Sequence, residues 1–143
     1  MRRSGGMTER FLVDTSVWIE ALRPGGQPEI AAWLREALLR EVVVLAPPVK
    51  AEILIGARDE KQFVELAEML GALPLLEERH EIWEQVASLG FRLRRQGLVV
   101  PVADLLIASW ALNYVCVLAH RDRHFVLVAE KVPGLATMSF LNG

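Results

Sequence analysis

Aspartate is scarce in this sequence, and the few aspartates that occur follow a pattern. The chain has 143 residues, with only four Asp against fourteen Glu. Asp14 directly follows an apolar run, Asp122 lies shortly after another, and Asp104 opens the apolar segment that precedes the second run. Clustered carboxylates bind hard cations such as Mg²⁺, and such a site can support hydrolysis of a phosphate ester. The elements that carry these residues decide whether they can meet.

The hydrophobic pattern predicts strands that alternate with helices. Apolar runs predict strands at residues 11–13, 42–46, 115–118 and 136–140. Helical spacing of apolar residues predicts helices between them, and the one over 102–114 is apolar nearly all round. This alternation predicts a three-layer α/β/α fold with a mainly parallel central sheet. Ligands bind beyond the carboxyl ends of the strands in such a sheet, so we expect the three aspartates named above at one edge.

Glu52 is a fourth candidate acid. On its predicted helix it shares a face with Val49, Ile55 and Gly56, so we expect its carboxylate to point inward, toward the same edge. Each acid also has a purely structural alternative. The three aspartates are suitable helix N-caps, and Glu52 would be exposed if its helix were short or misplaced. As a set, however, the four acids map to one end of the predicted sheet, which favours a shared acidic site.

Electrostatic repulsion predicts a bound cation at such a cluster. Two carboxylates about 5 Å apart repel by roughly 3 kcal/mol at an effective dielectric constant of 20. Four acids make six such pairs, and the sum approaches the stability of a whole domain. The sequence offers a single cysteine, Cys116, and three histidines, so the ligands are mainly oxygens and select Mg²⁺ or Mn²⁺.

Composition excludes several other classes of protein. Hydrophobic residues make up 52% and mean hydropathy is +0.28, which predicts a folded core and excludes disorder. A net charge of −2 gives no reason to coat nucleic acid non-specifically, so any such contact must be local. One cysteine cannot form an intrachain disulfide and favours a reducing compartment. With neither a secretion signal nor an apolar run of membrane-spanning length, we expect a cytoplasmic protein without a membrane span.

Four segments, each with one of the four acids, together resemble a known family. They are FLVDTSVWI at 11–19, AEILIG at 51–56, VADLLIA at 102–108 and HRDRHF at 120–125. This ordered set resembles the PIN-domain ribonucleases, and in particular the VapC toxins of bacterial and archaeal toxin–antitoxin operons. The resemblance spans nearly the whole chain. We therefore expect a short N-terminal tail at 1–6 and a single PIN-like domain at 7–143, with Met1 or Met7 as the start.

The resemblance implies specific roles for these residues. It implies catalytic, metal-binding acids at Asp14, Glu52, Asp104 and Asp122. It places the Thr15 or Ser16 hydroxyl near the site. The family usually has Thr or Ser two residues before the last acid, where this chain has His120. That imidazole is suited to hydrogen-bonding a metal-bound water, to contacting a phosphate or to ligating a softer ion, unless it is simply a surface residue after a strand.

Basic and aromatic residues near the motifs have two interpretations each. Three cationic or titratable residues flank the last acid and are candidates for RNA phosphate contacts, or else belong to a solvated loop: Arg121, Arg123 and His124. Three further arginines are better explained as the C-terminus of a helix than as an RNA-binding patch: Arg92, Arg94 and Arg95. We expect Trp18 and Trp110 to pack beneath the site. For Trp33 and Trp83 we favour core positions over a partner groove.

The leading functional hypothesis is a metal-dependent endoribonuclease that hydrolyses RNA and acts as the toxin of a type II toxin–antitoxin pair. The resemblance then also implies a cognate antitoxin protein and a homodimer. The alternative is a non-catalytic PIN-like module that binds RNA or protein. A third hypothesis, a phospho-acceptor receiver domain, needs a Lys after a late strand, and none of the three lysines of the chain is placed there.

Overall fold

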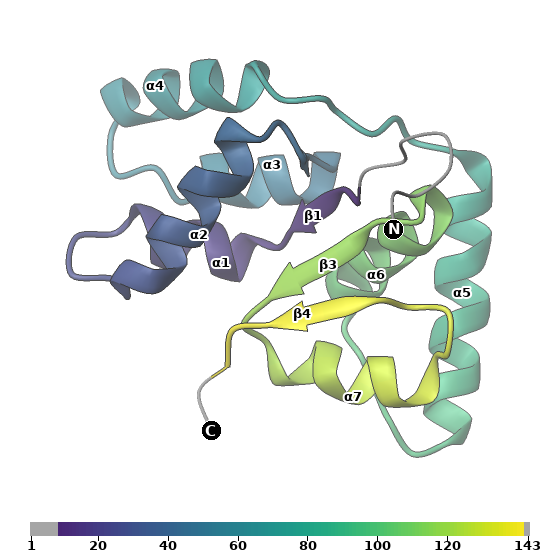
Figure 1. Cartoon of the computed structure of the whole chain (residues 1–143). Helices are drawn as coiled ribbons and strands as arrows, with labels where there is room; N and C mark the ends of the chain where they lie inside the picture. Colours follow the sequence, from purple (N-terminus) through teal and green to yellow (C-terminus); the bar gives the residue numbers. More distant parts are fainter. Residues whose placement is uncertain (1–8, 142–143) are drawn as a thin grey trace, which may run out of the picture.

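A four-stranded parallel sheet lies at the centre of the computed structural model, which describes residues 9–141 (Figure 1). The strand order is β2-β1-β3-β4. The strands are β1 (Phe11–Val13), β2 (Val43–Val44), β3 (Val117–His120) and β4 (Thr137–Ser139). The helices are α1 (Thr15–Leu22), α2 (Pro28–Leu39), α3 (Pro47–Ile55), α4 (Glu60–Gly71), α5 (His80–Arg95), α6 (Val102–Tyr114) and α7 (Arg123–Lys131). The tail expected at 1–6 and the start at Met1 or Met7 lie outside the described residues.

The register of the sheet brings the ends of β1 and β3 together. Leu12 pairs with Leu118, and Val13 pairs with Ala119. The Asp14 N–H then donates to the carbonyl of Ala119 at 2.8 Å, which fastens the first residue after β1 to the end of β3. The residues that follow β1 and β3 therefore lie at the same edge of the sheet, as the sequence predicts.

Helices cover the sheet and one another, which confirms the predicted three-layer fold. In Figure 1, α7 packs along β4, α6 contacts β3, and α5 lies on the outer side of α6. Helix α1 contacts α2, α3 and β3, and so lies beside the edge where β1 and β3 end. Between residues 9 and 141 no helix combines the length and the apolar character that crossing a membrane requires.

The third strand begins two residues later than predicted. Helix α6 ends at Tyr114, and its C-cap Val115 adopts a left-handed conformation with φ 54°. The N–H groups of Val115 and Cys116 return to the carbonyls of Leu112 and Ala111, which closes the helix. The strand therefore starts at Val117, although Val115 and Cys116 continue its apolar run.

Three of the four tryptophans pack in or against the hydrophobic core, which confirms the core position predicted for Trp33. Trp18 and Trp110 are buried, at 0% and 2% exposure. Trp33 is partly buried and packs edge to face between Phe11 and Phe140. The core position predicted for Trp83 is wrong. Its side chain is 46% exposed because it lies on the outer face of α5, where its indole N–H donates to the Glu78 carboxylate at 2.7 Å.

Candidate functional site

Asp14 combines a structural role with a place in the acidic site. It is the N-cap of α1, and its Oδ2 accepts hydrogen bonds from the Ser16 N–H at 3.1 Å and the Ser16 hydroxyl at 2.5 Å. The side chain is buried, and burial raises the pKa of this carboxyl above its usual value in spite of both bonds. The charges of Glu52 and Asp104 add to the rise in pKa, so these acids lie close enough to repel it.

Asp122 and Asp104 lie close together at the beginnings of α7 and α6. Asp122 is the N-cap of α7, and its Oδ1 accepts from the His124 N–H at 2.8 Å. Asp104 lies in the first turn of α6, whose N-cap is Pro101, so the alternative that Asp104 is an N-cap is wrong. Burial raises the pKa of Asp104, and the charges of Asp122 and Glu52 raise it further, against the opposing effect of His124.

Glu52 joins this group from an unexpected side. The inward orientation predicted for it is wrong: Glu52 is exposed, and Ile55 on the same face is 82% exposed. Helix α3 instead buries Val49 and Ile53. The Glu52 carboxylate nevertheless reaches the site, because its Oε1 accepts a hydrogen bond from the Thr15 hydroxyl at 2.5 Å. Both predicted hydroxyls therefore orient a site acid, Thr15 through Glu52 and Ser16 through Asp14.

His124 lies among the acids, whereas the sequence suggests either an RNA contact or a solvated loop for it. Its Nδ1 is 3.1 Å from Asp104 Oδ2 and 3.5 Å from Asp122 Oδ1. One ligand atom from each of these three residues can be chosen so that all lie within 4.8 Å of one another. The signal available in the sequence was the position of His124 two residues after an N-cap acid, where the first turn of a helix folds back toward the cap.

His120 is a buried residue that fixes the backbone of Asp122. It is 0% exposed, its ring packs against Phe125, and its Nδ1 accepts from the Asp122 N–H at 3.1 Å. Burial lowers its pKa, so the neutral ring is favoured. The surface alternative for His120 is therefore wrong, and a ring with no exposed area does not reach a phosphate in solvent. Its Nε2 is buried and has no hydrogen-bond partner within residues 9–141.

The two arginines of the last motif differ in their surroundings. Arg123 is exposed at the start of α7 and is free to contact a ligand from solvent. Arg121 Nη1 lies 3.4 Å from the buried carboxylate of Glu20, and the Arg121 N–H donates to the Ser16 hydroxyl at 3.1 Å. Glu20 was not among the acids predicted for the site, because its position on α1 has no feature that separates it from a solvent-facing residue.

The donor set fits a hard divalent cation. Asp104, Asp122 and His124 offer ligand atoms within 4.8 Å of one another, and Thr15, the residue after Asp14, donates a hydrogen bond to Glu52. Burial and the charges of neighbouring acids raise the pKa of Asp14 and of Asp104. A bound cation would relieve that repulsion, and carboxylate oxygens favour Mg²⁺ or Mn²⁺. The nearby imidazole of His124 suits a somewhat softer ion, so Mn²⁺ is a candidate beside Mg²⁺.

Comparison with known proteins defines the class. The model of the PIN domain family matches residues 11–131, and the chain belongs to this family. Among its curated relatives is Ribonuclease VapC11 of Mycobacterium tuberculosis, which is 32% identical over 135 residues covering 91% of this chain and 98% of the relative. The resemblance to VapC toxins that the motifs indicate is thereby confirmed.

Solved structures share the fold over the same extent. The crystal structure of FitAcB from Neisseria gonorrhoeae is 25% identical with a TM-score of 0.70, covering 90% of this chain and 96% of the other. The structure of VapBC2 from Rickettsia felis bound to a DNA fragment from its promoter is 20% identical with a TM-score of 0.73, covering 91% and 98%.

Proposed function

We propose that this protein is a metal-dependent endoribonuclease that hydrolyses RNA phosphodiester bonds and serves as the toxin of a type II toxin–antitoxin pair. The observation that carries the proposal is the set of contacts that gathers Asp14, Glu52, Asp104 and Asp122 where β1 and β3 end, in a chain related to VapC ribonucleases.

The chain's own residues hold and orient the site. Asp14, Glu52, Asp104 and Asp122 would bind Mg²⁺ or Mn²⁺. When bound, the cation supplies the positive charge that stabilises the attacking and leaving oxygens of a phosphodiester. The Ser16 and Thr15 hydroxyls orient two of the acids, since each donates to a carboxylate oxygen at 2.5 Å.

RNA contacts come from the rim of the site. The exposed side chain of Arg123 and the half-exposed ring of His124 lie next to Asp122 and are placed to hold phosphates that flank the scissile bond. Such local cations are needed because the chain as a whole carries a net charge of −2. Arg121 has less freedom to contact RNA, because its guanidinium is paired with Glu20.

A cognate antitoxin restrains the enzyme in the cytoplasm. Support comes from the solved VapBC complexes of the same fold. An Arg or Lys of the antitoxin that reaches the acids would replace the charge of the cation and so block the site.

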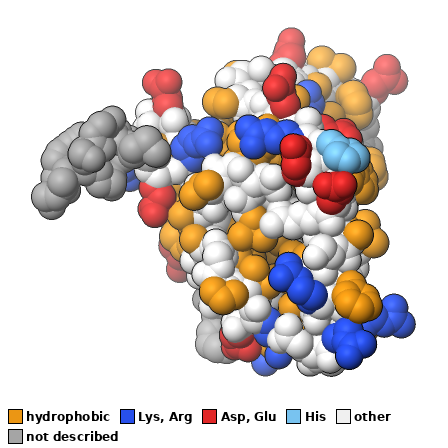
Figure 2. Space-filling model, turned by 90° about the vertical axis from the view of Figure 1, so that its right-hand side faces the viewer, with side chains coloured by type: hydrophobic (Ala, Val, Ile, Leu, Met, Phe, Trp, Pro, Cys, Tyr) orange, Lys and Arg blue, Asp and Glu red, His pale blue; other side chains and the backbone are white. Residues whose placement is uncertain are grey.

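A second copy of the chain binds through the outer face of α5, which makes the protein a homodimer. Trp83, Ala87 and Phe91 form an exposed stripe on α5, with Phe91 at 63% exposure. Glu81 lies in the first turn of this helix and three arginines lie in its last turn. Figure 2 shows this side of the molecule, where acidic side chains gather toward the top beside some basic ones and further basic side chains lie toward the bottom. Two antiparallel copies of α5 would place apolar side chains at the centre and opposite charges at each end.

Cleavage of RNA by the purified protein tests the function. We expect cutting with Mg²⁺ or Mn²⁺ and none after treatment with EDTA, with activity restored when metal is returned. Asp122→Asn should abolish cutting because one ligand is lost. Asp59→Asn is the matched control, since Asp59 caps α4 by accepting from the Gln62 N–H at 2.8 Å and asparagine caps equally well. Undiminished cutting in EDTA would overturn the metal mechanism, and RNA binding without cutting under all conditions would favour the non-catalytic module.

A further inference from the structure

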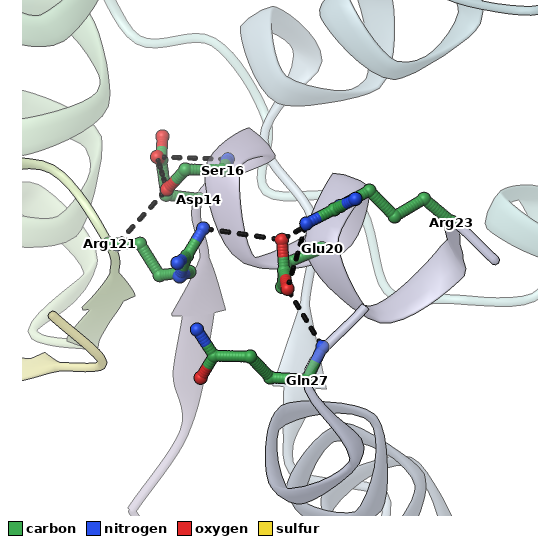
Figure 3. A network of polar contacts seen from close by, with 6 residues as sticks. All are labelled: Asp14, Ser16, Glu20, Arg23, Gln27 and Arg121. Carbon is green, nitrogen blue, oxygen red and sulfur yellow. Dashed lines mark hydrogen bonds and ion pairs between the residues drawn. The ribbon is translucent and has the colours of Figure 1, made fainter. Parts of the chain in front are cut away.

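A buried carboxylate, that of Glu20, lies on α1 behind the acidic site. The residue is 4% exposed and its carboxylate accepts hydrogen bonds from three directions (Figure 3). Arg23 donates through Nε at 2.9 Å and Nη2 at 3.4 Å, the Gln27 N–H donates at 2.8 Å, and Arg121 donates through Nη1 at 3.4 Å. Its pKa is held below the usual value, mainly by the bond from Arg23, so Glu20 is ionised at neutral pH.

Three of these four hydrogen bonds come from the chain that immediately follows α1. This segment folds tightly over the end of the helix: a Cβ on Gly26 would lie 2.0 Å from the Glu20 carbonyl oxygen. Arg23 and Gln27 therefore hold Glu20 from its own side. Arg121 is the partner that comes from a distant part of the sequence, the turn between β3 and α7.

Arg121 is also the residue through which Glu20 reaches the site. Its N–H donates to the Ser16 hydroxyl, and that hydroxyl donates to Asp14 Oδ2. Asp122 is the next residue along the chain. The turn that Glu20 holds through Arg121 therefore contacts Asp14 by way of Ser16 and continues along the chain into Asp122. Figure 3 shows the contacts of Asp14, Ser16, Glu20 and Arg121.

We propose that Glu20 is a positioning residue that anchors Arg121 and thereby fixes the turn between β3 and α7, which sets the places of Asp14 and Asp122 in the site. The proposal rests on the proposed function. It assigns Arg121 to the support of the acids and not to RNA. Supporting residues of this kind typically change metal affinity by about 10–100-fold when they are mutated.

The two arginines provide a matched pair of variants. Arg23→Gln and Arg121→Gln each remove one guanidinium from the same carboxylate, but only Arg121 belongs to the segment that contacts Ser16. We expect Arg121→Gln to weaken Mn²⁺ binding, measured by titration calorimetry, at least 10-fold. Arg23→Gln should leave Mn²⁺ affinity within about twofold of the wild type, because the side chain of Arg23 bonds to Glu20 and not to the turn that carries Asp122.

Amide hydrogen exchange gives a second measurement that needs no metal and no activity. The amides of residues 120–124 should exchange faster in Arg121→Gln and in Glu20→Gln, and at the wild-type rate in Arg23→Gln. Equal effects of the two arginine variants on both measurements would overturn the proposal, because Glu20 would then be only a structural residue. Wild-type Mn²⁺ affinity with weakened RNA binding in Arg121→Gln would also overturn it, in favour of a direct RNA contact. Absence of RNA cleavage in the wild type would contradict the proposed function alone.

Discussion

At the scale of single residues, capping a helix and binding a cation are compatible roles for one aspartate. Asp14 receives both Ser16 donors on Oδ2, and Asp122 receives the His124 N–H on Oδ1. Each carboxylate therefore keeps its other oxygen for a ligand. The caps also fix the side chains before any ligand arrives, which reduces the entropy lost on binding.

Asp104 is not an N-cap, so a substitution at this position tests the acidic cluster without removing a helix cap. In EDTA at neutral pH we expect Asp104→Asn to melt at a higher temperature than the wild type. The pKa of Asp104 is raised by burial and by neighbouring acids, so ionised Asp104 destabilises the fold. This cost grows as pH rises above the ordinary value of 3.8 and is absent at lower pH, so the two melting temperatures should converge in acid. Saturating Mn²⁺ should reverse the order, since the variant has lost a ligand.

Thermal melting of both proteins in EDTA and in Mn²⁺, across the acid range, measures this effect. Asp59→Asn should match the wild type under all these conditions, since Asp59 caps α4 away from the four acids. An Asp104→Asn protein that is less stable in EDTA and gains as much from Mn²⁺ as the wild type would show that Asp104 is not a ligand.

At the scale of elements, the strain at the end of α6 predicts an unusual stabilising substitution. Val115 has φ 54° and ψ 50° and is 88% exposed. A β-branched residue is disfavoured in this conformation by about 1–2 kcal/mol, whereas glycine adopts it readily and is common at this position. We expect Val115→Gly to stabilise the protein by about 0.5–1 kcal/mol, because little buried surface is lost.

Gly97 is the matched control for this substitution. It has φ 87°, and a Cβ there would meet nothing within 4 Å, so Gly97→Ala tests the backbone alone. We expect it to destabilise the protein by about 1 kcal/mol. Urea unfolding of both variants measures the two free energies. A destabilised Val115→Gly protein beside a neutral Gly97→Ala protein would contradict the left-handed backbone at these positions.

Element types could be predicted from the sequence, but some orientations and boundaries could not. Alternating apolar runs identify the strands and helices, and Asp59 with Gln62 forms the N-terminal cap of α4. The face of α3 could not be predicted, because Ile53, Leu54 and Ile55 are consecutive and each defines a different apolar face. Val115 favours a strand by its residue type, whereas the closure of α6 requires a turn there.

Buried polar residues mark the limit of prediction for the site. Asp14, Asp104 and Asp122 could be selected from the sequence because each follows or opens an apolar element, whereas Glu52 lies within α3 and the orientation predicted for it is wrong. Glu20 and His120 are indistinguishable in sequence from exposed residues, because their partners come from other segments or from folded backbone. Their burial results from the packing of α1 against the turn after β3. The hydrophobic periodicity of either segment alone does not predict this packing.

At the scale of the whole molecule, α5 carries acidic and basic residues at its opposite ends, on the side that does not pack into the core. Its inner face buries Ile82, Val86, Leu89 and Leu93. On the outside, the helix has Glu81 in its first turn and three arginines in its last turn. Between these ends lies the stripe of Trp83, Ala87 and Phe91. An antiparallel pair of such helices is self-complementary, as a two-fold symmetric contact requires.

Substitutions on this face test the proposed homodimer by sedimentation or light scattering. Antiparallel pairing centred on Ala87 places Trp83 of one copy against Phe91 of the other, so Phe91→Glu should give a monomer. Leu39→Glu is the control, since Leu39 is 73% exposed at the end of α2 and should leave the dimer intact. A dimer that survives Phe91→Glu would place the contact between copies elsewhere.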